Sequence, residues 1–319
     1  MRLMDLPPDM VRLVLQRLGT RSLLRIATTC RAMRALVAEM PLRPVMTSQT
    51  PMLHWLMSPA VAPRVLSLTA RNCLEGRCSF VHVLHSLRSL VVAFGHVAAS
   101  VCRWLPPSLE HLDIHRLDCG DMDVFSTKRL AHLDRLRTLK LTFTPRWDVV
   151  VVEQDFPRLE HLSIRSAPTL VVRAPVCARR VFLHASSALL CPFPVRAEEL
   201  GLECVMGPAS FDIMITPETA PSLRALHLAC PGRVTLPWLD CMRDLEELSV
   251  HYNSVMVHTR RLAALPKLRR LTLRTRYGIA VTGHACLGDG VVVSAEVSGV
   301  PLARASIDAM FFHKSSCRP

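Results

Sequence analysis

The sequence predicts an α/β repeat solenoid: a curved parallel sheet of irregular repeats, preceded by a small module of three helices. Two observations predict the sheet. A short apolar pattern, L-x-x-L-x-L, returns along most of the 319 residues, and hydrophobic residues make up 50% of the chain while aromatic residues make up only 5%. Such a composition suits many thin, similar aliphatic layers better than one bulky core. A third observation, helical periodicity without the repeat in the first forty residues, predicts the module.

The repeat is clearest in six copies with almost unchanged spacing. Their first leucines are Leu109, Leu136, Leu159, Leu223, Leu245 and Leu268. Weaker copies begin at Leu87, Ala178 and Ala197, and frayed ones at Pro63 and Val292. The first positions are 19 to 27 residues apart. This period resembles that of leucine-rich repeats, which is about 20 to 29 residues.

Each copy predicts a short strand, in which about three residues need be extended, followed by a longer return segment. The second and third apolar positions of the pattern face the core, and the residues between them face outward. Prolines are frequent in the return segments and disfavour long helices there, which favours loops, 3₁₀ turns or short helices. Because a return segment is wider than a strand, we expect the stack to bend and its outward residues to line a concave surface.

The first forty residues predict three short helices. The pair Pro7-Pro8 is tolerated in the first turn of a helix, and Gly19 can end that helix. Thr20 or Ser22 can cap a second helix. The apolar positions that would form the module's core are Met10, Val11, Val14, Leu15, Leu18, Leu23, Leu24, Ile26, Ala27, Met33, Leu36, Val37 and Met40.

This module resembles an F-box, which docks on the adaptor protein Skp1. The resemblance is carried by the strings Leu6-Pro7-Pro8-Asp9, Leu15-Gln16-Arg17-Leu18, Leu23-Leu24-Arg25-Ile26-Ala27 and Cys30-Arg31. Asp9 replaces the usual glutamate, and Met33 stands where a tryptophan is common. The resemblance implies that the residues contacting Skp1 are Leu6, Pro7, Met10, Val11, Leu15, Leu18, Leu24, Cys30 and Arg31.

The predicted domains are residues 1–40 for the F-box-like module, 41–62 for a linker or first return segment, 63–300 for about ten or eleven repeats, and 301–319 for a C-terminal tail. Prolines mark the junction after the module. A module that only covers the open end of the repeats is the alternative, since solenoids need their ends shielded.

The outward strand residues are the predicted contacts with a protein substrate. They are His115, Lys140, His161, Arg165, Arg180, Phe182, His184, Glu199, Glu203, His227, Glu247, His251, Arg270 and Arg274. Their mixed charge argues against a uniform track for phosphates. Phe182 is the one large apolar side chain among the central repeats and is a candidate hot spot, provided that the register holds. A one-residue slip would turn Phe182 into the core.

The sequence predicts no catalytic residue, cofactor or metal site. The fourteen histidines show no H-E-x-x-H spacing, the twelve cysteines form no C-x-x-C, and the twelve glycines form no phosphate loop. Dispersed cysteines favour free thiols in a reducing interior. Asp and Pro interrupt the N-terminus before an apolar signal region, and no apolar run reaches about 18 residues, so we expect no membrane span.

The F-box-like module followed by repeats predicts a substrate receptor of a cullin-RING ubiquitin ligase, with Skp1 at one end and a protein target on the sheet. A repeat scaffold or inhibitor with a helical cap is the alternative. A nucleic-acid binder is a weaker alternative, suggested only by the net charge of +13. The resemblance implies that the chain works in the cytoplasm or nucleus of a eukaryotic cell, which would be the host cell for a viral or bacterial protein.

Overall fold

The structure is a computed structural model. It describes residues 6–46, 55–71, 78–93, 97–118, 124–144, 149–153, 156–206, 215, 218–230, 239–282, 287 and 290–311. The chain divides into two compact units. Unit 1 comprises residues 1–120 and 129–141, and unit 2 comprises residues 121–128 and 142–319. Each unit is described by itself.

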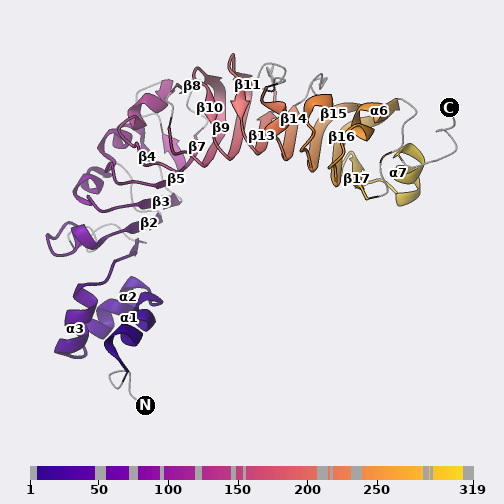
Figure 1. Cartoon of the computed structure of the whole chain (residues 1–319). Helices are drawn as coiled ribbons and strands as arrows, with labels where there is room; N and C mark the ends of the chain where they lie inside the picture. Colours follow the sequence, from indigo (N-terminus) through magenta and orange to yellow (C-terminus); the bar gives the residue numbers. More distant parts are fainter. Residues whose placement is uncertain are drawn as a thin grey trace. The chain divides into compact units, whose positions relative to one another are not determined.

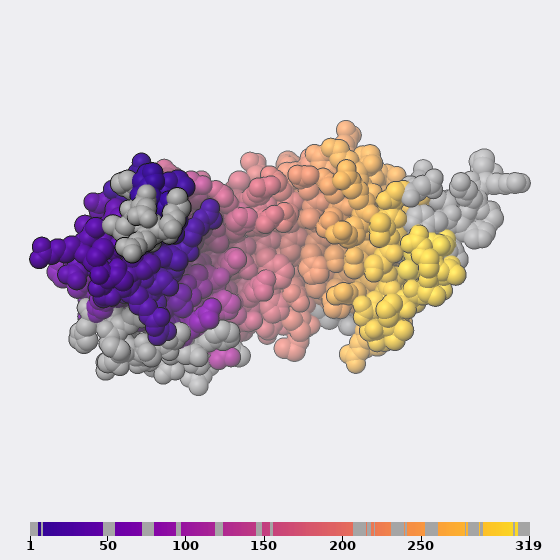
Figure 2. Space-filling model, turned by 90° about the horizontal axis from the view of Figure 1, so that it is seen from below, coloured from indigo at the N-terminus to yellow at the C-terminus, as the bar shows by residue number. Residues whose placement is uncertain are grey.

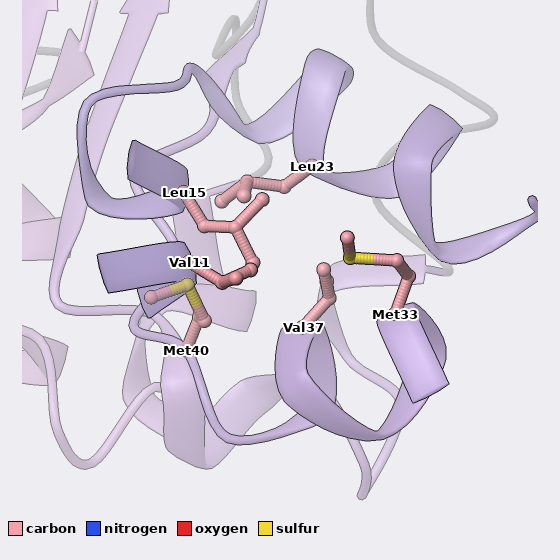
Figure 3. Close-up of a cluster of buried hydrophobic side chains, with 6 residues drawn as sticks. All are labelled: Val11, Leu15, Leu23, Met33, Val37 and Met40. Carbon is pink, nitrogen blue, oxygen red and sulfur yellow. The ribbon is translucent and has the colours of Figure 1, made fainter. Parts of the chain in front are cut away.

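Unit 1 begins with three short helices, α1 (Pro8–Gln16), α2 (Thr20–Ala27) and α3 (Arg31–Ala38). They pack around one apolar cluster, in which the labelled side chains of Figure 3 point toward one another: Val11, Leu15, Leu23, Met33, Val37 and Met40. Proline stands in the first turn of α1, as the sequence predicts. Gly19 is the N-cap of α2 and does not end α1 in a left-handed turn, which corrects the predicted cap.

Arg64 fastens the helical module to the repeat that follows it. Its guanidinium donates hydrogen bonds to the carbonyl oxygen of Met40, at 3.2 Å from Nε and 3.1 Å from Nη2, and to that of Val37. These carbonyls lie at and beyond the end of α3, where backbone donors become few, although the Val37 carbonyl also accepts the Met40 N–H at 3.1 Å. The Arg43 N–H also donates to Thr20 Oγ1 at 3.0 Å. The module is therefore hydrogen-bonded to its own repeat array.

The strands of unit 1 pair in parallel and nearly in sequence order. They are β1 (Val45–Met46), β2 (Ser67–Arg71), β3 (Ser89–Ala93) and β5 (His111–Asp118), with β4 (Val97–Ala98) beside β5. Strand β7 (Thr138–Phe143) lies where the two units divide. The return segments contain 3₁₀ helices, η2 (Ala62–Arg64), η3 (Cys78–Val83) and η4 (Ala99–Trp104). Strand β1 was not predicted, and it lies in the segment assigned to a linker.

Unit 2 continues with the same construction (Figure 1). Strands β9, β11, β13, β14, β15, β16 and β17 pair in parallel in that order, and β17 pairs antiparallel with β18. The bounds are β6 (Val124–Ser126), β8 (Val149–Val152), β9 (His161–Val172), β10 (Val176–Cys177), β11 (Arg180–Leu190), β12 (Val195–Arg196), β13 (Glu199–Cys204), β14 (Ala225–Cys230), β15 (Glu247–His258), β16 (Arg270–Thr282), β17 (Val292–Val297) and β18 (Val300–Pro301). In Figure 2 the colours of unit 2 succeed one another in bands, as sequential stacking requires.

Short helices complete the return segments. They are η5 (Thr127–Leu130), η6 (Ala220–Ser222), η7 (Leu239–Cys241) and α6 (Thr259–Ala263), and α7 (Arg304–Phe311) follows the last strand. The Phe311 side chain of α7 is 1% exposed. Where the structure describes them, the return segments are therefore turns, 3₁₀ helices and one short α-helix, which is the range that the prolines predict.

The apolar positions of the clear repeats all face the core. In β14 and β16, for example, Leu226, Leu228, Leu271 and Leu273 are at most 2% exposed. Both frayed repeats were placed two residues wrongly. Leu68 pairs with Leu90, so the first repeat begins at Val65 instead of Pro63. Likewise, Leu271 pairs with Val293, so the last repeat begins at Gly290 instead of Val292.

Several strands are much longer than the predicted three residues because they turn a corner and pair again. In β9, Ser166 adopts φ 57°, and the ladder with β11 shifts register at this point before resuming at Thr169. Arg116 in β5 has φ 64°, after which Leu117 pairs with β4. Left-handed conformations are costly for residues with a Cβ, so these corners are held by the ladders on both sides.

Candidate binding surfaces

The helical module exposes a set of apolar side chains on α1 and α2. Met10, Leu13, Val14 and Leu24 are 49%, 56%, 40% and 36% exposed. We call them the apolar docking surface. They are separate from the core cluster because α1 is apolar on more than one side, and only one side is needed to hold the three helices together. Exposed apolar side chains grouped on adjacent helices are typical of a protein interaction site.

The residues predicted to contact Skp1 divide into three groups. Pro7, Met10, Leu24, Cys30 and Arg31 are exposed, and Leu6 and Leu18 are partly buried. Val11 and Leu15, at 2% and 0% exposure, lie in the core cluster, so their burial does not fit a direct contact with an adaptor. Leu13 and Val14 were not among the predicted Skp1 contacts, and the exposure of Met10, Val14 and Leu24 corrects their predicted place in the module's core. The three- and four-residue spacing of Leu13 and Val14 from Met10 was the available signal.

Cys30 has a local structural role besides its exposure. Its Sγ accepts a hydrogen bond from the N–H of Met33 at 3.5 Å, and Cys30 is thereby the N-cap of α3. On the neighbouring surface, Arg12 in α1 donates to Glu39 Oε2 at 2.7 Å, which ties α1 to the residue that follows α3. The first contact holds the start of α3, and the second holds α1 against the end of α3.

Residues 3–44 match the family model of the F-box domain. The match spans α1, α2, α3 and the first residues after them, and includes every residue predicted to contact Skp1. The N-terminal module is therefore an F-box domain. No curated protein matches the chain.

The second candidate surface is the outward face of unit 2. In-register pairing aligns its side chains in three rows that run across the strands. The first row contains His161, Arg180, Glu199, Ala225, Glu247 and Arg270; the second Ser163, Phe182, Gly201, His227, Ser249 and Thr272; and the third His184, Glu203, Ala229, His251, Arg274 and Glu296. The structure thus brings together most of the predicted substrate contacts on one face.

Ion pairs between adjacent strands neutralise many charges of the outward face. Arg180 Nε lies 2.8 Å from Glu199 Oε2, and Arg270 Nη1 lies 2.8 Å from Glu247 Oε1. Arg274 Nε lies 3.3 Å from Glu296 Oε2. The mixed charge that the sequence predicts is therefore largely arranged as cross-strand pairs, each of which fixes the position of its partner.

A second set of ion pairs joins residues that immediately precede neighbouring strands. The Arg224 guanidinium donates to Glu246 Oε1 at 2.6 Å, and this hydrogen bond, followed by the charge of Arg224, lowers the pKa of Glu246. Lys267 Nζ donates to Asp244 Oδ1 at 2.7 Å, which lowers the pKa of Asp244 in the same way. Because these groups are exposed, the pairs orient side chains more than they stabilise the fold.

Phe182 faces outward and its ring lies flat on the sheet. Gly201 is the neighbour of Phe182 on β13. A Cβ at Gly201 would overlap the Phe182 ring, so the ring can occupy this position only because residue 201 is a glycine. The Arg165 guanidinium carbon lies 4.9 Å from the ring centroid, within the range of a cation–π interaction. The predicted register of β11 is therefore the one that the structure has, while the role of Phe182 in binding stays a prediction.

Two histidines of the outward face are held in the sheet. The Ser166 N–H donates to His184 Nδ1 at 2.9 Å, so the His184 ring stabilises the left-handed corner of β9. Burial lowers the pKa of His227, as do the charges of His251 and Arg274, against the opposing effect of Glu203. His227 is therefore neutral at pH 7 and can act as a hydrogen-bonding group.

The other two predicted substrate contacts, His115 and Lys140, belong to unit 1. Both side chains are exposed, and His115 Nε2 lies 3.3 Å from Asp113 Oδ1. In the part of the chain that the structure describes, no three His, Cys, Asp or Glu side chains are grouped closely enough to hold a metal ion. Within the same residues, no helix has the length and apolar character needed to cross a bilayer.

Proposed function

We propose that this chain is the substrate receptor of a cullin-RING ubiquitin ligase. Its F-box domain would dock on a Skp1-type adaptor through the apolar docking surface, and the outward face of unit 2 would hold a target protein. In such an assembly other subunits carry out the ubiquitin transfer, and the receptor contributes by holding the target near the activated thioester.

The F-box match at residues 3–44 carries this proposal. The exposure of Met10, Leu13, Val14 and Leu24 supports it, because these side chains need a partner surface and do not contribute to the module's core. The parallel strands with period-two burial also support the interpretation of the remaining chain as a leucine-rich-repeat solenoid, a fold that offers an extended surface for protein recognition.

A helical cap without an adaptor is the second candidate. It is favoured by the hydrogen bonds from Arg64 to the carbonyls of Val37 and Met40, because a cap has to be joined to the first repeat. These bonds use the end of α3 and leave the apolar docking surface on α1 and α2 exposed. One chain could therefore serve both purposes, and a binding experiment is needed to separate them.

The test is co-purification of the full chain with recombinant Skp1, beside the double variant Met10→Asp and Val14→Asp. Both side chains are at least 40% exposed, so their substitution should leave the module folded. We expect the wild-type chain to form a stable complex and the double variant to bind at least about tenfold more weakly, which corresponds to about 1.4 kcal/mol.

Met206→Asp is the matched control, because Met206 is a methionine of unit 2 that is 73% exposed. This variant should bind Skp1 as the wild-type chain does. Circular dichroism should give the same helix and strand content for all three proteins. A folded wild-type chain that fails to bind Skp1 would rule out the receptor and leave the cap.

A further inference from the structure

An open groove in unit 2 crosses five consecutive strands, near the ends of β13, β14 and β17 and over the interior of β15 and β16. It has a volume of about 520 Å³ and is lined by residues of β13, β14, β15 and β16 and by the turn after β17. We call it the edge groove. Its lining residues are Glu203, Cys204, Val205, Ala229, Cys230, His251, Tyr252, Thr275, Arg276, Ser298 and Gly299. The groove crosses the strands, so its length follows from the strand spacing.

Within the described part of the chain, the carboxylate and the guanidinium that line the edge groove have no counter-ion. Among the described residues, neither Glu203 nor Arg276 forms an ion pair, whereas Glu199, Glu247 and Glu296 on the same face are each paired with an arginine. Arg276 stacks on Tyr277, with its guanidinium carbon 5.6 Å from the ring centroid. A positive and a negative charge therefore remain available at separate places in one groove.

The floor of the edge groove departs from the aliphatic pattern of the repeats. The inward rows that precede it consist of leucine, isoleucine, valine and alanine, while the last inward row contains Cys204, Cys230, Tyr252 and Thr275. Thr275 is 5% exposed, and its Oγ1 has no hydrogen-bond partner among the described residues.

We propose that the edge groove binds an extended peptide segment of a partner protein that carries a cationic and an anionic side chain four residues apart. Glu203 binds the cation and Arg276 binds the anion. The partner is the ubiquitination target if the proposed function holds, but the peptide site itself does not depend on the F-box domain.

The spacing follows from the sheet geometry. Glu203 is in register with Arg274 three strands away, and Arg276 lies two residues beyond Arg274. The ladder between β15 and β16 shifts register after Thr275, so the strand spacing sets the separation: three strands at about 4.8 Å place Glu203 and Arg276 about 14 Å apart, which an extended peptide spans in four to five residues. Side chains of an extended peptide share a face only at even separations, which selects four.

A peptide fits this groove better than a nucleic acid does. Glu203 would repel a phosphate chain at one end, and the described lining residues include a single arginine and no lysine. The exposed apolar side chain of Val205 suits the aliphatic part of a peptide. Opposite charges at the two ends also fix the direction in which the peptide lies.

The experiment measures binding of fluorescein-labelled nonapeptides to the full chain by fluorescence anisotropy. Two probes carry Lys and Glu four residues apart in either order within an Ala/Val/Ser background, and a third carries them as adjacent residues. We expect one of the first two to bind at least about tenfold more tightly than the third, and Glu203→Gln to remove that difference.

A charge exchange separates recognition from folding. Glu203→Lys should transfer the preference to a probe with Glu in place of Lys, while Glu160→Gln, an exposed carboxylate of unit 2 outside the groove, should change binding less than about twofold. Equal binding of all three probes, or none up to about 1 mM, overturns the proposal. Skp1 binding is measured on the same preparations, so failure of the groove and failure of the F-box domain are distinguished.

Discussion

At the scale of single residues, Gly201 matters because it has no side chain and so leaves room for Phe182. The Phe182 ring occupies the space that a Cβ would need. Gly201→Ala should displace the ring from its place beneath Arg165 and lower the free energy of unfolding by about 1 to 3 kcal/mol, the usual cost of overpacking. Urea unfolding followed by circular dichroism measures this change.

Gly290→Ala is the control for Gly201→Ala, because a Cβ at Gly290 would meet no atom within 4 Å. It should change stability by less than about 0.5 kcal/mol. The double variant Gly201→Ala and Phe182→Leu should recover part of the loss, since the smaller side chain frees the space. If Gly201→Ala had the same free energy of unfolding as Gly290→Ala, the position of the Phe182 ring against Gly201 would be contradicted.

His227 predicts a pH dependence of stability. Its pKa is lowered, first by burial and then by the positive charges of His251 and Arg274. The unfolded chain takes up a proton near pH 6.5, while the folded chain resists protonation until the pH is lower. The unfolded state therefore binds more protons in this range, and the contribution of His227 to stability is complete above about pH 6.5 and falls as the pH is lowered.

The measurement is the midpoint of urea unfolding at several pH values between 7.5 and 5, for the wild-type chain and for His227→Gln. We expect the variant to lose less stability than the wild-type chain between pH 7 and 5.5. His115→Gln is the comparison, because His115 is an exposed histidine in unit 1. Equal pH dependence in wild type and His227→Gln would show that burial does not perturb this ring.

At the scale of elements, period-two alternation explains both what the sequence could predict and what it could not. Inward and outward positions of clear repeats such as β14 and β16 follow directly from the pattern. A shift of two residues preserves that alternation, so Pro63 and Val292 looked as suitable as Val65 and Gly290. Only pairing with the neighbouring strand distinguishes the two registers.

The longer strands and the docking surface escaped prediction for different reasons. The corners at Arg116 and Ser166 are left-handed turns at residues that carry no glycine signal, so the continuation of β5 and β9 is set by tertiary pairing. In α1, apolar residues occupy several sides, and the sequence could not show which of them three short helices bury. The F-box resemblance implied that Leu15 contacts Skp1, although its side chain is fully buried.

Arg64 gives an element-scale prediction, because one side chain joins the F-box domain to the first repeat. Arg64→Ala leaves the carbonyls of Val37 and Met40 without this donor and should destabilise unit 1 by about 1 to 3 kcal/mol. Arg64→Lys should recover only part of the loss, because an ammonium group cannot reproduce the guanidinium geometry. Thermal unfolding by circular dichroism measures both variants, with exposed Arg103→Ala as a control that should change little.

At the scale of the whole molecule, the net charge of +13 is a poor guide to the partner. Charge alone would favour nucleic acid, whose affinity depends on how many phosphates the protein neutralises. On the outward face of unit 2, however, arginines such as Arg180 and Arg270 are already paired with glutamates. A phosphate would have to displace a carboxylate from each of these two arginines, so on this face they do not form a track for phosphates.

We therefore expect the full chain to bind duplex DNA weakly, with a dissociation constant above about 1 μM at physiological salt and a slope of log K against log salt no steeper than about −3. The double variant Glu199→Gln and Glu247→Gln frees Arg180 and Arg270 and should steepen the slope by up to about two. Fluorescence anisotropy with a labelled duplex at several salt concentrations measures both proteins. A slope steeper than about −6 in the wild-type chain would instead mean that its arginines are gathered for phosphates, because each neutralised phosphate contributes close to one unit to that slope.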